Sequence, residues 1–181
     1  VYLWIHDGEA ELRDAAHLMG HFTADVEDAI REELEDRRIH ILQCGPAAER
    51  GVRYGALVNN ANRVNGRGGM GTVMASKNLK AVAVRGTAKL ELADRDAAMD
   101  LAKWGAQNVD ESGVAGFKRL GTAALVLSQS MAGGLPTHNW SSGTLEDAEA
   151  ISGERMKETI LKSGDTCFGC AVRCKRVVEV N

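Results

Sequence analysis

The apolar residues of this chain change their spacing near residue 90, and this change constrains the fold strongly. Before it, short runs such as Tyr2–His6 and Leu79–Val84 alternate between side chains of different polarity, which predicts β-strands. After it, apolar residues recur at helical spacing, as in Asp94–Asn108. We therefore expect an α+β fold, with a sheet-containing part over residues 1–90 followed by the start of an all-α part over residues 91–181.

Local signals place further elements. The Asp7-Gly8 turn is expected to lead into a helix, and Ile39–Leu42 and Ala56–Val58 are expected to be strands. Thr23 is expected to cap a helix over Ala24–Arg38, since acidic residues fill its first turn and basic residues its last. The second part is expected to hold a helix over Val114–Met131 with a break near Gly121, a loop over Gly133–Gly143 and a last helix over Glu154–Lys162.

Composition and charge exclude several classes of protein. The 181 residues suffice for one domain, or for one domain and part of another. The formal net charge of −3 argues against a protein that binds nucleic acid through general electrostatics. The sequence shows no membrane span and no export signal, and its cysteine spacing suits a metal site in a reducing compartment, so we expect a cytoplasmic protein. Its ends look cut, so we expect a fragment.

Three of the four cysteines fall close together, at Cys167, Cys170 and Cys174. A tight turn can bring two of these sulfurs together and the next turn of chain can supply the third, which suits one soft metal centre. A zinc site would need a second pair of cysteines, and the sequence has none. The spacing favours a [4Fe-4S] cluster whose fourth ligand is either Cys44 or a residue beyond Asn181. The alternative is three unrelated small core residues beside a basic turn.

A glycine-rich segment with two arginines runs from Asn62 to Gly71. Bare backbone N–H groups in such a turn form an anion site, and Arg63 and Arg67 add guanidinium groups that pair with phosphate. We interpret the segment as a phosphate cradle. A Rossmann nucleotide site is disfavoured, because the segment follows a polar stretch and precedes a strand expected near Leu79. A purely structural glycine turn is the other alternative.

Two further places offer polar groups to a ligand. They are the segment that holds Gly45, Pro46, Glu49, Arg53 and Asn59, and the loop that holds Thr137, His138 and Asn139. In general, a lone loop histidine is more often a hydrogen-bonding residue than a catalyst, and a lone glutamate is more often a solvated charge.

Together these residues resemble the tungsten-dependent aldehyde ferredoxin oxidoreductase family. The matching segments are Asn-Arg-x-x-Gly-Arg-Gly-Gly-x-Gly from Asn62 to Gly71, Val-Met-x-Ser-Lys-Asn-Leu-Lys-Ala from Val73 to Ala81, Leu-Pro-Thr-x-Asn from Leu135 to Asn139, and the three clustered cysteines. They occur in the family's order and cover nearly the whole chain. The resemblance implies an incomplete pterin-binding domain over residues 1–90 and the start of a helical domain with the cysteine motif over residues 91–181.

The resemblance also implies an enzyme and its cofactors. Such an enzyme oxidises aldehydes to carboxylic acids with tungsten or molybdenum between two pterins, and passes electrons through a [4Fe-4S] cluster to ferredoxin or a similar carrier. The implied cofactor-binding residues are Arg63 and Arg67 for the pterin phosphates, the Val64 carbonyl near the Mg ion that joins the pterins, and Gly66, Gly68 and Gly69 for close approach of the cofactor to the backbone. The implied cluster ligands are Cys167, Cys170 and Cys174.

The same resemblance implies that other functional residues lie elsewhere. The fourth cluster cysteine and the catalytic acid and base are expected beyond Asn181, so Cys44 is expected to be an ordinary strand residue and this chain alone to be inactive. The sequence departs from the family pattern at Ala171, where Pro is common, at Ala75, where Gly is common, and at His138, where Arg is common. None of these departures removes a ligand.

The substrate is left open, because the family includes enzymes for formaldehyde and glyceraldehyde-3-phosphate and enzymes that reduce the aromatic ring of a coenzyme A thioester. A subunit like class II benzoyl-CoA reductase is therefore an alternative. A stand-alone iron–sulfur electron-transfer module and a nucleotide-phosphate-binding domain with structural cysteines are the others. No nucleic-acid or membrane partner is expected, and a homodimer is left open.

Overall fold

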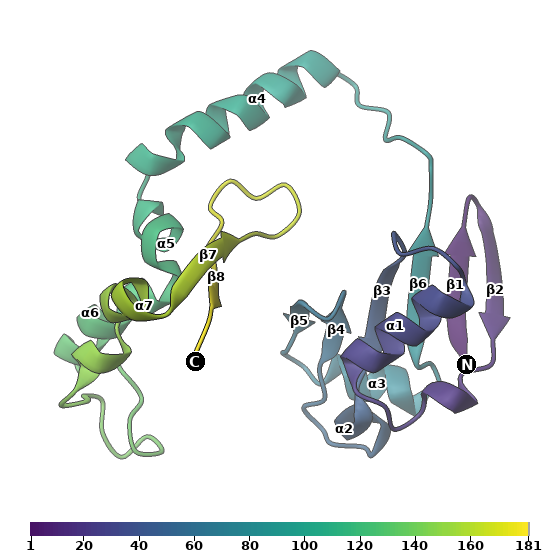
Figure 1. Cartoon of the computed structure of the whole chain (residues 1–181), viewed down its shortest axis with the longest axis horizontal. Coiled ribbons are helices and arrows are strands. Elements are labelled where there is room, and N and C mark those ends of the chain that lie inside the picture. The colour runs from purple at the N-terminus through teal and green to yellow at the C-terminus, as the bar shows by residue number, and fades with distance from the viewer. Residues whose placement is uncertain (181) are drawn as a thin grey trace. The chain divides into compact units, whose positions relative to one another are not determined.

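A six-stranded mixed sheet organises the first part of the chain (Figure 1). The computed structural model describes residues 1–180 and divides the chain into two units, Val1–Leu90 and Glu91–Asn181. The strands of the sheet are β1 (Tyr2–His6), β2 (Glu9–Arg13), β3 (His40–Cys44), β4 (Leu57–Asn59), β5 (Arg63–Asn65) and β6 (Ala81–Arg85). Their order is β2-β1-β6-β3-β4-β5, in which β1 and β6 run parallel and the other neighbours run antiparallel.

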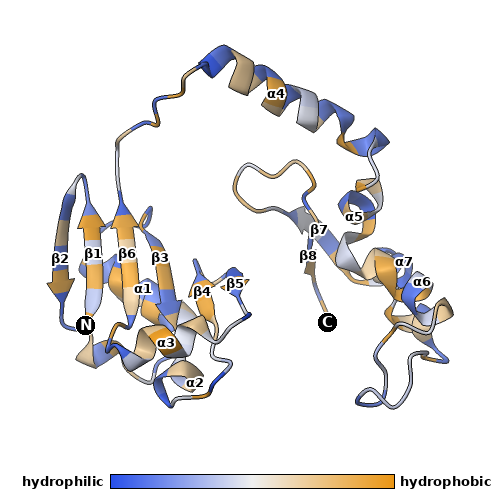
Figure 2. Ribbon diagram, turned by 180° about the vertical axis from the view of Figure 1, so that it is seen from behind, coloured by the Kyte–Doolittle hydropathy of each residue, from blue (hydrophilic) through white to orange (hydrophobic). Residues whose placement is uncertain are grey.

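One face of this sheet carries the core of the first unit. Alternate residues of the central strands pack against Val26 and Ile30 of α1 (Thr23–Glu33), which lies across that face (Figure 1). The strand residues of this core are Tyr2, Trp4, Ile41, Ala81 and Ala83. Figure 2 shows that hydrophobic residues concentrate in β1, β6 and β3, whereas the edge strand β2 is largely hydrophilic. This pattern follows from the period of two in a strand, which sends alternate side chains to the covered face.

Short helices complete the first unit. They are the 3₁₀-helix η1 (Ala16–Leu18), α2 (Pro46–Glu49) and α3 (Met70–Ser76). Pro46 opens α2 directly after Gly45, which follows β3. This is a favoured place for proline, because the first helical N–H has no partner within the helix. The helices α2 and α3 pack against each other, so the glycine-rich segment before α3 lies against the chain that follows α2.

The second unit is mainly helical and ends in a two-stranded hairpin. Its helices are α4 (Arg95–Asn108), η2 (Val109–Glu111), α5 (Ala115–Leu120), η3 (Gly121–Leu125), α6 (Val126–Met131), η4 (Ala148–Ile151) and α7 (Gly153–Thr159). The strands β7 (Leu161–Asp165) and β8 (Lys175–Val178) pair antiparallel. Asp94 caps α4 by accepting a hydrogen bond from the Ala97 N–H at 2.9 Å. No helix among residues 1–180 combines the length and the apolar character needed to cross a membrane.

The structure confirms the α+β class, with the sheet first and a helical region after it. Several local expectations are wrong. The turn at Asp7 and Gly8, with φ of 43° and 94°, leads into strand β2 instead of a helix. The helix α1 begins at Thr23, which is therefore not its cap, and it ends at Glu33. The last helix, α7, ends at Thr159, and β7 takes the residues after Ile160.

Two elements near the glycine-rich segment were not expected from the sequence. Strand β5 forms in the polar stretch, because its backbone pairs with β4 and needs no apolar side chains. Helix α3 follows the glycines directly, before the β6 strand. The local context of a strand, a glycine-rich turn and a helix is thus present, but α3 has only 7 residues and β5 belongs to an antiparallel hairpin, unlike the parallel unit of a Rossmann site.

Candidate functional site

The β4–β5 hairpin positions the start of the glycine-rich segment. Asn59 pairs with Arg63 and Val58 with Val64 across the hairpin. Its turn is tied to β3, because the Asn60 N–H donates to the Ile41 carbonyl at 2.9 Å and the Asn60 side-chain oxygen accepts from the Ile41 N–H at 2.9 Å. Arg63 and Val64 therefore directly follow a turn that is hydrogen-bonded to the central sheet.

Two glycines of this segment, Gly69 and Gly66, differ in whether a side chain would fit. Gly69 is buried and has φ of +65°, and a Cβ placed on it would overlap the Arg53 carbonyl oxygen, so close packing of two backbones requires glycine there. Gly66 is exposed, and a Cβ there would meet only a Val64 methyl group, at 3.9 Å. Packing inside the unit therefore explains Gly69 and leaves Gly66 free to admit a group from outside.

The two arginines of the segment differ in their surroundings. Arg63 is half-buried and its Nη1 donates to the Asn62 carbonyl at 3.0 Å. Arg67 is exposed and makes no ion pair or hydrogen bond through its guanidinium within residues 1–180. The segment thus presents a guanidinium group and open backbone at Gly66 on the surface of the first unit. This donor set fits the phosphate of a pterin cofactor, which the structure does not contain.

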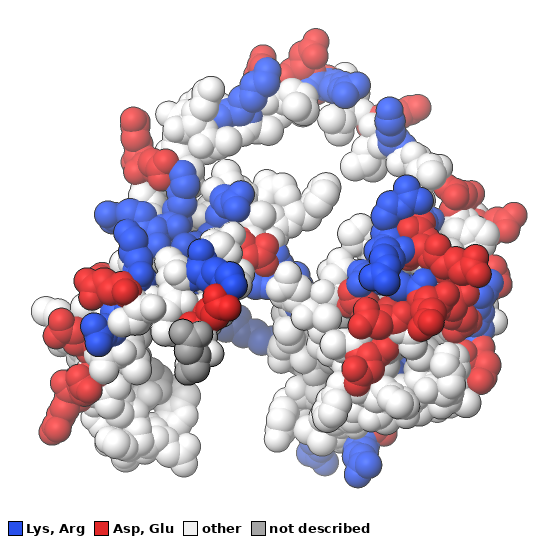
Figure 3. Space-filling model, viewed as in Figure 1, with Lys and Arg blue, Asp and Glu red and all other residues white. Residues whose placement is uncertain are grey.

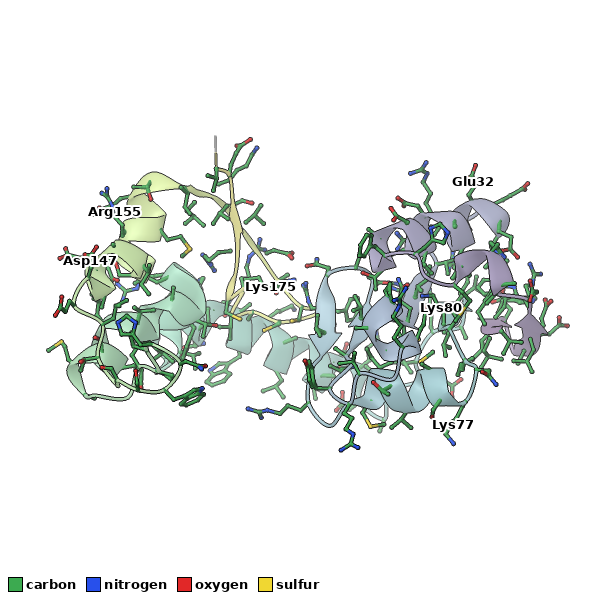
Figure 4. The ribbon with its side chains drawn as sticks, turned by 90° about the horizontal axis from the view of Figure 1, so that it is seen from below. Glu32, Lys77, Lys80, Asp147, Arg155 and Lys175 are labelled. Atoms are coloured by element: carbon green, nitrogen blue, oxygen red, sulfur yellow. The ribbon has the colours of Figure 1, made fainter. Side chains whose placement is uncertain are left out.

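A buried ion pair lies in the same unit, between Lys80 and Glu49. The Lys80 Nζ donates to the Cys44 carbonyl at 3.0 Å and to one oxygen of Glu49, whose other oxygen accepts from the Gly20 N–H at 2.8 Å. Lys80, Glu49 and Cys44 line a cavity of about 290 Å³. Figure 4 shows Lys80 within the first unit. Both oxygens of Glu49 are engaged inside the unit, so the structure gives Glu49 a structural role instead of a solvated one.

Cys44 ends strand β3 and is fully buried. Its sulfur lies 3.5 Å from the Lys80 carbonyl, and burial raises the pKa of the thiol. A thiol with a raised pKa is a poor metal ligand, because ligation needs the thiolate. Lys80 itself was not singled out from the sequence, although a lysine within an otherwise apolar alternation was the available signal.

The three clustered cysteines lie in the loop that joins β7 to β8. The Cys170 N–H donates to the Cys167 carbonyl at 3.1 Å, which closes a turn through Gly169 at φ of +67°. The Thr166 hydroxyl lies 3.0 Å from the Cys167 carbonyl and 2.7 Å from the Cys170 carbonyl. The first two cysteines therefore share a tight turn, as their spacing predicts.

All three of these thiols are free, with Cys167 exposed and Cys170 and Cys174 half-buried. Within residues 1–180, no three His, Cys, Asp or Glu side chains come together in an arrangement that could hold a metal ion. The loop thus supplies three soft donors on one short segment without gathering their sulfurs. That donor set fits an iron–sulfur cluster in its chemistry, and ligation by these residues stays a prediction.

The loop around His138 has an unusual backbone. His138, Asn139 and Trp140 have φ of 49°, 56° and 72°, and Thr137 and Ser142 form an isolated bridge that closes the loop. Three successive non-glycine residues with positive φ are strained. The prediction that Thr137, His138 and Asn139 contact a ligand remains a prediction.

Comparison with known proteins places both units in one family. Residues 1–86 match the model for the N-terminal domain of aldehyde ferredoxin oxidoreductase. Residues 100–181 match the model for domains 2 and 3 of the same enzyme. The chain belongs to the aldehyde ferredoxin oxidoreductase family. The glycine-rich segment lies within the first match, and the cysteine loop lies within the second.

Individual relatives agree with this assignment. The chain is 41% identical over 179 residues to a tungsten-containing aldehyde ferredoxin oxidoreductase of Pyrococcus abyssi, and 38% identical to one of Pyrococcus horikoshii. In both cases the match covers 98% of this chain and 30% of the relative. A solved structure, the active site complex BamBC of benzoyl coenzyme A reductase with 1,5-dienoyl-CoA, matches with a TM-score of 0.71 and 25% identity, over 99% of this chain and 29% of the other.

The matched relatives are much longer than this chain, which spans about 30% of their length. They are named as tungsten-containing oxidoreductases, so the family is one of oxidoreductase enzymes.

Proposed function

We propose that the chain forms part of a tungsten- or molybdenum-pterin oxidoreductase. The enzyme oxidises aldehydes to carboxylic acids and passes the electrons through a [4Fe-4S] cluster to ferredoxin or a similar carrier. The observation that carries this proposal is the ordered match of both units to one family, with the two candidate cofactor segments in the units expected for them. When bound, such cofactors supply the redox chemistry, and the protein supplies binding, orientation and electrostatics.

The glycine-rich segment is the proposed pterin site. Arg63 and Arg67 bind pterin phosphates, and the exposed Gly66 and Gly68 let the cofactor approach the backbone. Gly69, expected from the resemblance to do the same, contributes by letting the segment pack against the Arg53 carbonyl. The free guanidinium of Arg67 and the open space at Gly66 support this role. The Val64 carbonyl is proposed to lie near an Mg ion, and the exposure of Val64, 63%, is compatible with contact to a bound group.

The cysteine loop is the proposed cluster site. Cys167, Cys170 and Cys174 supply three thiolates, and the fourth ligand and the catalytic acid and base come from sequence beyond Asn181. Basic side chains lie near the base of the loop: Lys and Arg gather over α5 and the β7–β8 hairpin, with some acidic side chains among them, in the left part of Figure 3. Positive charge near a cluster offsets its negative charge and helps to set its potential.

The proposal also covers the electron carrier, the oligomeric state and the cellular compartment of the enzyme. Ferredoxin or a similar carrier accepts the electrons, a homodimer is one assembly to test, and the cytoplasm is the proposed compartment.

A second function is favoured by one specific observation. The structural match to the benzoyl coenzyme A reductase complex, with a TM-score of 0.71, indicates that this fold also occurs in a reductase of a coenzyme A thioester. The alternative is therefore a subunit that reduces an aromatic ring. The higher identity, 41%, is to a protein named as an aldehyde oxidoreductase, which is why aldehyde oxidation is proposed first.

An activity assay on the full-length protein that contains this chain, purified anaerobically with its cofactors and called the holoprotein below, distinguishes these functions. The assay supplies acetaldehyde with oxidised ferredoxin in one arm, and benzoyl-CoA with a low-potential reductant in the other. The proposal expects acetate and reduced ferredoxin from the first arm. Ring reduction in the second arm, with no aldehyde oxidised in the first, would instead support the reductase.

A matched pair of variants tests the phosphate role of Arg67. Arg67→Ala is expected to lower the pterin and tungsten content per chain, because it removes the exposed guanidinium of the glycine-rich segment. Arg50→Ala removes an equally exposed arginine at the end of α2 and is expected to keep the wild-type content. Equal pterin content in the two variants would contradict the assignment.

A further inference from the structure

Arg176 of β8 connects the cysteine loop to helix α5. Its Nη2 donates to the Lys118 carbonyl at 3.1 Å and also to the Arg173 carbonyl, and its Nη1 donates to the Arg119 carbonyl at 3.4 Å. Lys118 and Arg119 belong to the last turn of α5, whose carbonyl groups have no partner within the helix. A single planar guanidinium thus joins the end of a helix to the residue before Cys174.

Gly121 brings the same helix end against Cys174 itself. It has φ of +67°, and a Cβ placed on it would lie 2.7 Å from the Cys174 carbonyl oxygen and 3.0 Å from Cγ of Arg176. Only glycine allows both the positive φ and this approach. The Cys174 end of the loop is therefore packed against the junction between α5 and η3.

At the other end of the loop, the Thr166 hydroxyl donates to the Cys167 and Cys170 carbonyls, and the tip beyond it projects. A Cβ on Gly169 would meet nothing within 4 Å, and the neighbouring Phe168 side chain is fully exposed. The loop thus has one end fixed by the body of the unit and one end that projects from it. Gathering the three sulfurs requires movement, and we expect the projecting Cys167–Cys170 turn to be the part that moves.

Arg176 also has an unused donor. Its Nε is buried and has no hydrogen-bond partner among residues 1–180. A buried donor without an acceptor is costly in a folded protein. This Nε lies beside Gly121, 3.3 Å from where a Cβ of that residue would stand, so the donor faces the helix end that Arg176 holds.

We propose that Arg176 is a positioning residue for the iron–sulfur group. It fixes the Cys174 end of the loop through three backbone carbonyls, so that Cys174 is placed before metal arrives and the Cys167–Cys170 turn closes onto it. This inference rests on the proposed function, since it assumes that the loop binds the cluster. It adds a role for a residue that is not itself a ligand.

Three variants of the holoprotein test the proposal. Arg176→Ala removes all of the donors, and Arg176→Lys keeps the charge but loses the planar fork that reaches several carbonyls. Arg119→Ala is the matched control, because the Arg119 side chain is exposed and its carbonyl, which accepts from Arg176, remains. Each protein is followed by the loss of cluster absorbance in excess EDTA and by the EPR spectrum of the dithionite-reduced cluster.

The expected result is that Arg176→Ala loses its cluster about tenfold faster than wild type, as is typical when a residue that orients metal ligands is removed. Arg176→Lys is expected to lose it faster than wild type as well, with an altered EPR spectrum in both variants. Arg119→Ala is expected to keep the wild-type rate and spectrum. If Arg176→Ala does not fold, Arg176→Lys alone carries the test.

The outcomes separate this inference from the proposed function. A wild-type protein that binds iron, with Arg176 variants that keep its rate of cluster loss and EPR spectrum, overturns the positioning role and leaves the proposed function standing. A wild-type protein that binds no iron overturns both.

Discussion

Among single residues, Lys80 and Glu49 have the most consequence for stability. The Lys80 side chain is fully buried and that of Glu49 is 8% exposed, so each charge depends on the other. The pair joins the start of β6 to α2, and the Cys44 carbonyl of β3 accepts from the same ammonium group. The elements that frame the glycine-rich segment are thus held together from inside.

Removing one member of this pair is expected to be strongly destabilising. Lys80→Met leaves the Glu49 carboxylate buried without its partner, and the free energy of unfolding should fall by about 3–5 kcal/mol. Urea unfolding followed through the fluorescence of buried Trp4 measures this change. The double variant Lys80→Met with Glu49→Gln should recover part of the loss, since no unpaired charge remains.

A surface lysine provides the control for that experiment. Lys162 pairs with Glu179 at 2.7 Å, but both side chains are 60% exposed. Lys162→Met should therefore change the free energy of unfolding by no more than about 1 kcal/mol. If Lys80→Met proved as mild as Lys162→Met, the buried pair would not have the structural role assigned to it.

Asp36 links the chain after α1 to strand β6 and makes stability depend on pH. Its carboxylate accepts from Arg38 Nε at 3.0 Å and from Arg85 Nε at 2.9 Å. These hydrogen bonds, chiefly those from Arg38, hold the pKa of Asp36 well below its ordinary value of 3.8. A carboxyl whose pKa is lowered by folding adds stability above its ordinary pKa and loses it as the pH falls through the folded value.

The Asp36→Asn variant tests this dependence. The wild type should be more stable than the variant at neutral pH, and the difference should shrink from about pH 5 downward. Asp28→Asn is the control, because Asp28 is exposed on α1 and forms no ion pair within residues 1–180. Urea midpoints measured from pH 7 down to acid conditions report both, and a difference independent of pH would be evidence against the linkage.

Among helices and strands, the sequence predicted best where one signal dominated. Helical spacing over Asp94–Asn108 indicated α4, although Asp94 proves to be its cap, and the alternation in Tyr2–His6 indicated β1. The cysteine spacing predicted a tight turn, which Cys167 and Cys170 form. These elements depend on local interactions, which is why their own residues sufficed.

Elements that depend on distant partners were missed. Strand β2 reads Glu-Ala-Glu-Leu-Arg, and it is a strand because it pairs with β1 along its whole length. Strand β5 is polar and forms because it pairs with β4. Strand β8 likewise forms because it pairs with β7. The sequence predicted that α1 would extend to Arg38, but it ends at Glu33. Glu35 has a positive φ, and Asp36 is held by Arg85 of β6, a distant partner that the local sequence does not reveal.

In the candidate site, too, the sequence predicted local features and missed those that depend on distant contacts. The sequence singled out Gly66 and Gly69 together, but only the fold separates the glycine that packing requires from the one that it leaves open. The hydrogen bonds of Arg176 to α5 come from tertiary packing, which the spacing of the residues does not reveal.

The two glycines of the segment before α3 can be tested against each other. Gly69→Ala should lower the free energy of unfolding by at least about 1 kcal/mol, because alanine is strained at positive φ and its Cβ would overlap the Arg53 carbonyl. Gly66→Ala should change it by no more than about 0.5 kcal/mol, because the site is exposed. The same Gly66→Ala protein should bind less pterin than wild type.

We would measure thermal or urea unfolding and pterin content on both variants to test the two roles. A Gly66→Ala protein with wild-type pterin content would show that the open glycine has no role in cofactor approach. A Gly69→Ala protein with wild-type stability would contradict the packing explanation for Gly69.

In the molecule as a whole, one chain joins two units that carry different candidate cofactor-binding groups. The first unit carries a glycine-rich segment with an exposed guanidinium group, and the second carries three free thiols on one loop. Both belong to one family, in the order that the family models give. We therefore propose that these two segments serve one pterin–metal and iron–sulfur enzyme.

Metal and cofactor analysis of the full-length protein that contains this chain, purified anaerobically from cells supplied with tungstate and molybdate, is the decisive test of this shared role. We predict about four Fe and about one tungsten or molybdenum per chain, with pterin released on denaturation. Iron without tungsten, molybdenum or pterin would contradict the shared role and leave an electron-transfer module. A protein without any metal would contradict it as well and would make Cys167, Cys170 and Cys174 structural residues.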